Sequence, residues 1–407
     1  MSANALPIRR LAALGLLVVA LLVPPHAVAQ EPPSIVSNAT WFDPSIQTAG
    51  MGSASVAVFW LDEPNEWGNP AALGSVRGIR YAYGKTDLTP FVLDFDDLQS
   101  KRLLVGALGV GVSLGGKGLE LLGGTRLDYA ERTVTDGLGN SFTITPYERV
   151  RSLAVGVSVL DLLSTTVQLF GGDPIGLRDR VFLSVGHSWK DLSADMGLDP
   201  VLSQPWSGEG ESLDRGALVR IAPLDKIGAT MGEPRESAAV RIELGGGYLE
   251  RNYDEQDPDD VVVVLEQEKV YGASGRITVA LSTPIDRGWF WDFATPSIAI
   301  AGAWEQTEGE TPVFGGFDYR RVRYGGELSI LGLITLRHGR IDRDPTGIEG
   351  ETWGAGLALQ YRKSVGVRFD WARVPWSEES GEVNRYGVTA YLDLTKFDSS
   401  GGLAPRD

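Results

Sequence analysis

From about residue 76 onwards, apolar and polar residues alternate in stretches of about ten residues. In one such stretch, the apolar positions Val365, Val367, Phe369 and Trp371 alternate with Gly366, Arg368, Asp370 and Ala372. Successive side chains of a β-strand point to opposite faces, so this alternation predicts strands with one apolar and one polar face. The chain after residue 75 is therefore predicted to be all-β.

Two features of these stretches favour a membrane barrel over a soluble sandwich. Arg and Glu stand in the middle of the polar face, whereas the other face is made of Val, Leu, Ile and aromatic residues. The stretches also have roughly the 9–11 residues that a tilted strand needs to cross a bilayer, and aromatic residues such as Tyr83 and Trp371 stand near their ends. The prediction is a transmembrane antiparallel β-barrel, and a soluble all-β protein remains the alternative.

The alternation predicts about fourteen strands. They are expected near residues 76–86, 101–114, 121–132, 148–160, 179–190, 215–223, 237–250, 269–282, 297–306, 318–330, 333–341, 351–362, 365–374 and 385–396. An even number of strands places both chain ends on the periplasmic side, so the connections on that side should be short. Residues 161–178 are an exception, because they form a long connection on that side.

The stretch from Gln47 to Leu73 fits neither a helix nor the strand pattern. It begins with Gly50, Met51 and Gly52, continues with small residues, and ends in Asn69, Pro70 and Ala71. Small residues let one backbone pass close to another, and a barrel of about fourteen strands has a lumen that needs a filler. Residues 30–74 are therefore expected to form a hatch inside a barrel of residues 75–397, followed by a polar tail at 398–407.

The first 29 residues have the features of a cleaved export signal. Arg9 and Arg10 precede an apolar run from Leu11 to Val23, and Ala27-Val28-Ala29 provides small residues for cleavage before Gln30. The chain has no cysteine, which excludes thiol chemistry, disulfides and a lipid-bearing cysteine anchor. A net charge of −16 argues against nucleic acid as a partner.

A signal peptide followed by Gly50-Met51-Gly52, then by Asn69-Pro70-Ala71, and then by about fourteen strands resembles the FadL-type outer-membrane transporters. It is similar also to the related PorV/PorQ-like outer-membrane barrel proteins. The resemblance implies an N-terminal hatch inside the barrel and a place in the outer membrane of a Gram-negative-type bacterium. The charged stretch from Leu61 to Trp67 departs from the family's pattern.

The polar face of the strands carries mixed charges that are expected to line the lumen. They are Arg80, Arg241, Glu243, Arg276, Arg321, Arg323, Glu327, Arg368 and Asp370. They could orient the acidic head of an amphipathic solute, or they could be a charge ladder that fills a narrow lumen; the second interpretation is favoured. Val367→Arg should place a charge against lipid near mid-strand and cost about 2–4 kcal/mol, whereas Arg368→Val should cost much less because it changes only the lumen.

No catalytic, metal or cofactor site is predicted. The acidic run from Asp254 to Asp260 could bind calcium through oxygen ligands, but it lacks the spacing of a known calcium loop, and a solvated outer loop is the favoured interpretation. Ser184 and His187 are both present without a nucleophile elbow, so an enzyme is not expected.

The predicted function is passive passage of hydrophobic or amphipathic small molecules, such as long-chain fatty acids, across the outer membrane, as the FadL-type resemblance implies. Outer-membrane lipid and a hydrophobic solute are the expected partners. Two alternatives remain open at this point. One is a PorV-like role as a component of a protein-secretion system, and the other is a structural or adhesive role at the cell surface.

Overall fold

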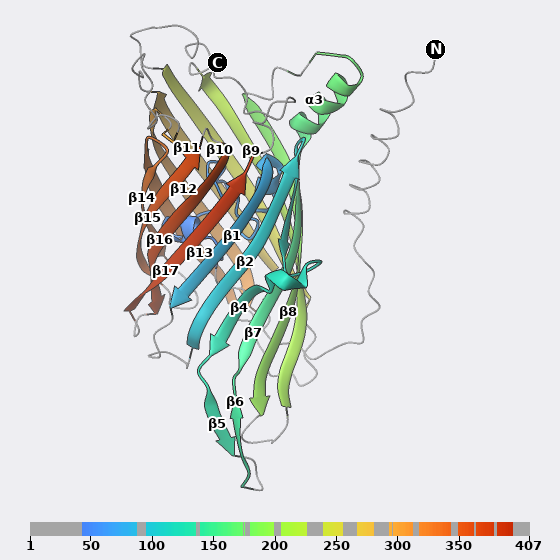
Figure 1. Ribbon diagram of the computed structural model, residues 1–407, viewed down its shortest axis with the longest axis vertical. Helices are drawn as coiled ribbons and strands as arrows, with labels where there is room; N and C mark the ends of the chain where they lie inside the picture. The colour runs from blue at the N-terminus through green and yellow to red at the C-terminus, as the bar shows by residue number, and fades with distance from the viewer. Residues whose placement is uncertain are drawn as a thin grey trace, which may run out of the picture.

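The computed structural model describes the greater part of the chain (Figure 1). The described residues are 43–87, 95–135, 139–173, 175, 180–198, 205–225, 239–254, 267–280, 293–294, 296–311, 317–342, 349–361, 364–377 and 381–393. The expected signal peptide and the expected polar tail at 398–407 lie outside them. Among these residues, no helix is long and apolar enough to span a membrane.

The strands form one closed antiparallel barrel. Its fifteen strands are β1 (Gly78–Asp87), β2 (Phe95–Ala107), β3 (Val110–Gly115), β4 (Gly124–Tyr129), β7 (Tyr147–Ser158), β8 (Val181–Leu198), β9 (Pro205–Asp225), β10 (Ala239–Asp254), β11 (Gln267–Ala280), β12 (Ser297–Thr311), β13 (Phe317–Ile330), β14 (Ile334–Asp342), β15 (Gly350–Tyr361), β16 (Val365–Ser377) and β17 (Gly381–Leu392). Strands at neighbouring positions of the wall are paired, and β1 pairs with both β2 and β17, which closes the sheet. Because closure leaves no open edge, every strand of the wall is paired on both sides.

Two of these strands share one position in the wall. β3 and β4 each pair with β2 on one side and with β7 on the other, and residues 116–123 leave the wall between them. The fifteen strands therefore occupy fourteen positions, which confirms the predicted fourteen-stranded barrel. The short helix η3 (Glu120–Leu122) lies in this interruption.

The two faces of the wall differ in polarity as a bilayer requires. Along β14, outward residues such as Ile334 and Leu336 are exposed, and they alternate with the buried Thr335 and Arg337. Aromatic residues lie opposite one another on the outer face, with Trp304 beside Tyr324 and Trp371 beside Tyr386. An apolar outer face bordered by aromatic residues is the arrangement of a membrane-spanning barrel.

The predicted second strand at 101–114 is wrong, because a tight turn divides it. Leu108 and Gly109 both have positive φ, at 55° and 86°, and Ala107 pairs directly with Val110 across them. Such turns are usually marked by Asn-Gly or Asp-Gly, so Leu-Gly looked like a continuing strand. Before the turn, Leu104 is buried on the inner face while Val105 is exposed on the outer face.

The two ends of the barrel are built differently (Figure 1). At the end where β1 begins and β17 finishes, here named the terminal end, Ile79 pairs with Leu392. The long connection expected at 161–178 contains the helix α3 (Val159–Leu169) at this end. At the opposite end, here named the far end, a hairpin of β5 (Arg132–Thr135) and β6 (Ser141–Ile144) projects beyond the rim.

Candidate functional site: the segment inside the barrel

The chain before β1 runs once around the inside of the wall. This inner segment, residues 46–76, includes a single turn of helix, α2 (Ile46–Ala49), and a short helix, η2 (Pro70–Ser75). Its successive residues lie against inward glycines: Ile46 at Gly387 of β17, Gly50 at Gly354 of β15, Met51 at Gly339 of β14 and Gly325 of β13, Val56 at Gly272 of β11 and Gly247 of β10, Asn69 at Gly216 of β9, Pro70 at Gly186 of β8, Leu73 at Gly156 of β7 and Gly111 of β3, and Val76 at Gly106 of β2. The order of these strands is the order of the wall, so the segment completes a circuit.

Close approach requires glycine at these wall positions. A methyl group on Gly156 would lie 2.5 Å from the carbonyl oxygen of Pro70, and one on Gly106 would lie 2.5 Å from that of Val76. Several of these glycines are paired across neighbouring strands, including Gly111 with Gly156 and Gly186 with Gly216. These inward glycines, here named the glycine belt, therefore leave a groove in which the backbone of the inner segment lies. The high glycine content of the sequence did not by itself reveal this role.

The motif residues lie within this circuit. The Asn69 side-chain amide donates to the carbonyl oxygens of Val56 at 2.7 Å and Ala217 at 3.0 Å, and its oxygen accepts from the Ala71 amide at 3.0 Å. Asn69 thereby caps η2, with Pro70 at the first helical position, where no amide donor is needed. One side chain thus joins two stretches of the inner segment to β9.

The glycine-rich start of the motif is equally enclosed. The Gly52 amide donates to the Thr352 hydroxyl at 2.8 Å, and Gly52 has a φ of 69°, a left-handed conformation that glycine adopts without strain. Met51 is fully buried. The small residues Gly50 and Gly52 on either side of it allow its backbone to touch the wall.

The charged stretch from Leu61 to Trp67 leaves the wall and crosses the lumen. Glu66 accepts from Arg102 of β2 at 2.7 Å and from the Ser113 hydroxyl of β3 at 2.8 Å, and Glu63 also pairs with Arg102. Asp62 pairs with Arg368 of β16 at 2.6 Å, and only β17 and β1 separate β16 from β2 in the closed wall. The carboxylates are therefore tied by ion pairs to the side of the wall opposite β10 and β11, where Val56 lies.

Burial and neighbouring charges shift the pKa values of two carboxyl groups in this crossing. Burial raises the pKa of Glu66 to about 7, although the Ser113 hydroxyl and the Lys190 ammonium favour its charged form. Burial also opposes the charge on Asp62, but Arg368 and Arg80 outweigh it and hold the pKa of Asp62 below its ordinary value. The pKa of Glu66 is thus raised and the pKa of Asp62 is lowered, although only four residues separate them.

Trp67 ends the crossing in a second charged site. The Lys190 ammonium lies 4.5 Å from the Trp67 ring centroid and pairs with Asp214 at 2.5 Å. Arg251 donates to the Trp67 carbonyl oxygen at 2.6 Å. Strands β8, β9 and β10 therefore hold this end of the crossing through both its ring and its backbone.

The nine residues expected to line the lumen lie on the inner face of the wall, but the structure does not gather them into one site. Arg368, Asp370 and Glu327 form one network, joined through Arg337, which lies 2.8 Å from Asp370 and 2.9 Å from Glu327. Two further pairs lie on other strands, Arg241 with Glu243 at 3.1 Å and Arg323 with Glu305 at 3.3 Å. Arg80 and Arg276 are close enough to Asp62 to influence its ionisation.

Arg368 is not freely exchangeable, because it holds several partners at once. It bonds Asp62, Asp370 and the Thr335 hydroxyl at 2.6 to 3.0 Å. Removing it would leave Asp62 without its nearest counter-charge and Asp370 with Arg337 alone, so Arg368→Val is expected to be costly, contrary to the expectation from its place in the lumen.

The sequence did not identify Arg102, Arg337, Lys190 and Glu66 as members of this site. Arg102 was hidden by the unrecognised turn at Leu108, which obscured the orientation of β2. Arg337 had a visible signal, since it alternates with the apolar Leu336 and faces inward with Thr335. The pairing of Glu66 with Arg102 could not be predicted, because 36 residues separate them along the chain.

The structure places Ser184 and His187 on different faces of β8. The Ser184 hydroxyl donates inward to the Ala71 and Val157 carbonyl oxygens, whereas the His187 ring meets Trp189 edge-on at 4.3 Å between centroids. The acidic run lies outside the described residues from 255 onwards. Within the part of the chain that is described, no group of three or more His, Asp or Glu could hold a metal ion.

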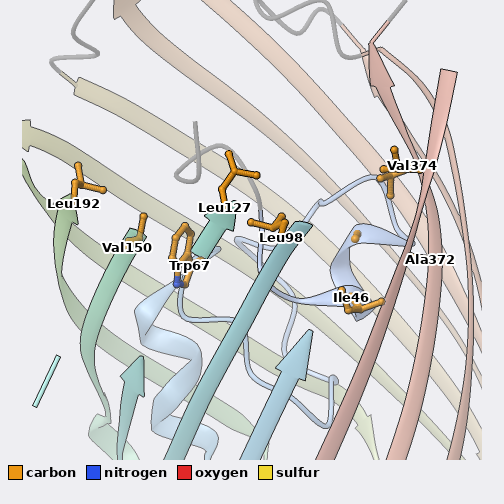
Figure 2. Packing of buried hydrophobic residues seen from close by; sticks show 10 residues of the cluster. Ile46, Trp67, Leu98, Leu127, Val150, Leu192, Ala372 and Val374 are labelled. Atoms are coloured by element: carbon orange, nitrogen blue, oxygen red, sulfur yellow. The ribbon is translucent and has the colours of Figure 1, made fainter. Parts of the chain in front are cut away.

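An apolar cluster lies inside the barrel beside the crossing (Figure 2). Trp67 and Ile46 of the inner segment pack with inward residues of the wall: Leu98, Leu127, Val150, Leu192, Ala372, Val374 and Val383. In Figure 2, Trp67 lies beside Val150, Leu127 and Leu98, whereas Ile46 lies near Ala372 and Val374. The inner face is therefore apolar at positions where a porin lumen is polar.

Comparison with solved structures returns proteins of the FadL-type class that the sequence resembles. They include the toluene transporter TodX of Pseudomonas putida (10% identity, 84% of this chain and 95% of that chain, TM-score 0.36) and a FadL homologue of Pseudomonas aeruginosa (11%, 85% and 98%, TM-score 0.35). A further match is the monoaromatic hydrocarbon channel CymD (11%, 88% and 99%, TM-score 0.37). No family model and no curated protein matches the chain. At these scores the matches establish no activity, and the fold is defined by the chain's own strand pairing.

Proposed function

We propose that this protein is an outer-membrane channel for hydrophobic or amphipathic small molecules, in which the inner segment acts as a hatch. The observation that carries the proposal is the apolar cluster around Trp67, which lies inside the wall of a membrane barrel. An apolar lining offers a solute such as a long-chain fatty acid or an aromatic hydrocarbon what a polar pore does not.

The packing of the inner segment supports the hatch. The segment touches most strands of the wall, and its charged stretch inside the lumen pairs with Arg102 of β2 and Arg368 of β16. A fourteen-stranded barrel without such a filler would have a lumen wide enough for water. Passage of polar solutes is therefore expected to be slow while the segment is in place.

Uptake by liposomes tests the solute class. Vesicles that carry the protein should take up a long-chain fatty acid faster than empty vesicles, with little faster entry of sucrose. The variant Leu127→Asp places a charge in the apolar cluster and should reduce fatty-acid uptake, whereas Leu122→Asp, at a partly exposed position outside the cluster, serves as the matched control. Equal uptake by empty vesicles would contradict the proposal.

Planar-bilayer conductance tests the hatch separately. The full chain should give little current, and deletion of residues 47–74 should leave a folded barrel that conducts steadily. A full chain that already conducts like an open porin would contradict the hatch but leave the barrel intact. A stable complex with envelope proteins and no fatty-acid uptake would instead support the secretion role, which no contact among the described residues favours.

A further inference from the structure

The helix α3 carries its apolar side chains on the outside of the molecule. Leu163, Val167 and Phe170 are 50%, 37% and 70% exposed, and they share one side because they are spaced by four and three residues. Leu169 beside them is also exposed. A helix that covered the barrel as a soluble cap would turn these residues inward.

The charged residue and the buried serine of α3 face the protein instead. Asp161, its only charged residue, pairs with Arg77 at 2.7 Å and accepts from the Ser158 hydroxyl at 2.9 Å. Ser164 is fully buried and accepts from the Ile175 amide at 3.0 Å. The outward side of the helix is therefore left apolar and uncharged.

This apolar side continues the lipid-facing surface of the wall. α3 follows β7 directly and contacts β8, whose outward residues Leu183 and Val185 are exposed. On the other side lies the β2–β3 turn, where the Ser158 amide donates to the Gly109 carbonyl oxygen at 2.6 Å. Leu108 in that turn is 51% exposed, so the apolar surface runs from the wall across the turn to the helix.

The tight turns of the terminal end independently indicate an apolar surrounding. Leu108 and Leu331 each occupy the first left-handed position of a turn, with φ of 55° and 56°, and a glycine follows each. Asn or Asp is the favoured residue there, and Leu adopts this conformation only at a cost. A Leu at both positions is reasonable if these turns meet lipid rather than water.

From these observations we propose that α3 is an interfacial anchor, which inserts its Leu163, Val167 and Phe170 side into the lipid leaflet around the terminal end. The occupant of this surface is phospholipid at the boundary of head groups and acyl chains. Four half-exposed side chains cover far less than the roughly 800 Å² per partner of a stable protein interface, which argues against a second copy.

Through Arg77, the anchor also reaches the junction of the inner segment and β1. Arg77 pairs with Asp161 of α3 and donates to the carbonyl oxygens of Gly74 and Val76. The lipid-bound helix therefore holds the point at which the inner segment leaves the lumen.

The absence of cysteine from the chain permits a direct test. Phe170→Cys and Leu163→Cys place a nitroxide label on the proposed lipid side, and Gln168→Cys places the matched control on the opposite side of the same helix. In phosphatidylcholine vesicles, labels at 163 and 170 should collide more with oxygen than with a water-soluble nickel chelate, and the label at 168 should show the reverse. Because the lipid side is uncharged, raising the salt concentration should not change this.

Two outcomes would overturn the anchor. Equal access of the nickel chelate to all three labels would place the apolar side in water. Labels at 163 and 170 that are shielded from both reagents would indicate a protein partner, including a second copy of the chain. A heat-dependent shift on unheated gels shows for each variant that the barrel has folded, so neither outcome can arise from misfolding.

Discussion

The inner segment is attached to the barrel in two different ways. Residues 46–58 and 69–76 touch the wall backbone to backbone, because the wall has glycine where the segment passes. Residues 61–67 make no such circuit and are attached by the carboxylates of Asp62, Glu63 and Glu66. The first attachment depends on shape, which tolerates no added atom, and the second depends on charge, which pH and substitution can alter.

Removal of Arg102 should have the largest effect on how firmly the inner segment is attached. Arg102→Met leaves Glu63 and Glu66 buried without their shared counter-charge, and breaking a buried pair in this way costs about 3–5 kcal/mol. We expect faster protease cleavage within residues 46–76 and a lower unfolding midpoint in detergent.

Two further variants test whether the effect comes from leaving buried carboxylates without a counter-charge. Arg340→Met removes an exposed ion pair with Asp342 and should cost less than about 1 kcal/mol. The triple variant Arg102→Met, Glu63→Gln and Glu66→Gln should recover much of the loss, since no unpaired charge remains. An equal effect of Arg102→Met and Arg340→Met would show that the crossing is not held by charge.

A single methyl group on the glycine belt should have the next largest effect. Gly186→Ala introduces an atom 2.5 Å from the Pro70 carbonyl oxygen, and overpacking of this kind costs about 1–3 kcal/mol. Gly302→Ala is the matched control, because its added carbon would meet nothing closer than a carbonyl oxygen at 3.7 Å. Unfolding of both variants in urea would measure the difference, and equal midpoints would contradict a steric role for the belt.

The smallest expected effect is a dependence on pH through Glu66. Its pKa is about 7 when packed and 4.5 ordinarily, so the packed segment binds the extra proton between these values. Packing should therefore weaken as pH rises from 4.5 to 7 and change little above pH 7. Asp62, whose pKa is lowered, contributes only below its ordinary value of 3.8 and in the opposite direction.

The pH effect can be measured as the protection of amides in the crossing against hydrogen exchange at pH 5.5 and pH 8, after division by the intrinsic exchange rate at each pH. Protection should be lower at pH 8, and Glu66→Gln should remove the difference in protection. The groups that face Glu66 are Arg102, Glu63, Ser113, Lys190 and Asp43, so the same experiment on Glu63→Gln separates the two carboxylates. A difference that persists in Glu66→Gln would assign the titration to another group.

Local alternation in the sequence was sufficient to predict the number of wall positions and which face of most strands is apolar. It failed at Leu108, where a turn without its usual residues divides the strand expected at 101–114. The expected hatch at 30–74 is described from residue 43, and its role as a hatch stays a prediction. The candidate lining residues could be placed on a polar face, but not joined to their partners.

By itself, the sequence determined the properties that depend on neighbours along the chain: strands of period two, an apolar outer face, and an N-terminal stretch too rich in small residues to be a strand. Only the tertiary structure decided which groups meet across the lumen, because ring closure brings together residues as distant as Asp62 and Arg368. The tertiary structure also shows why the wall has inward glycines. An inward glycine is recognisable as a groove only when the backbone that fills it, such as Pro70 against Gly186, is in place.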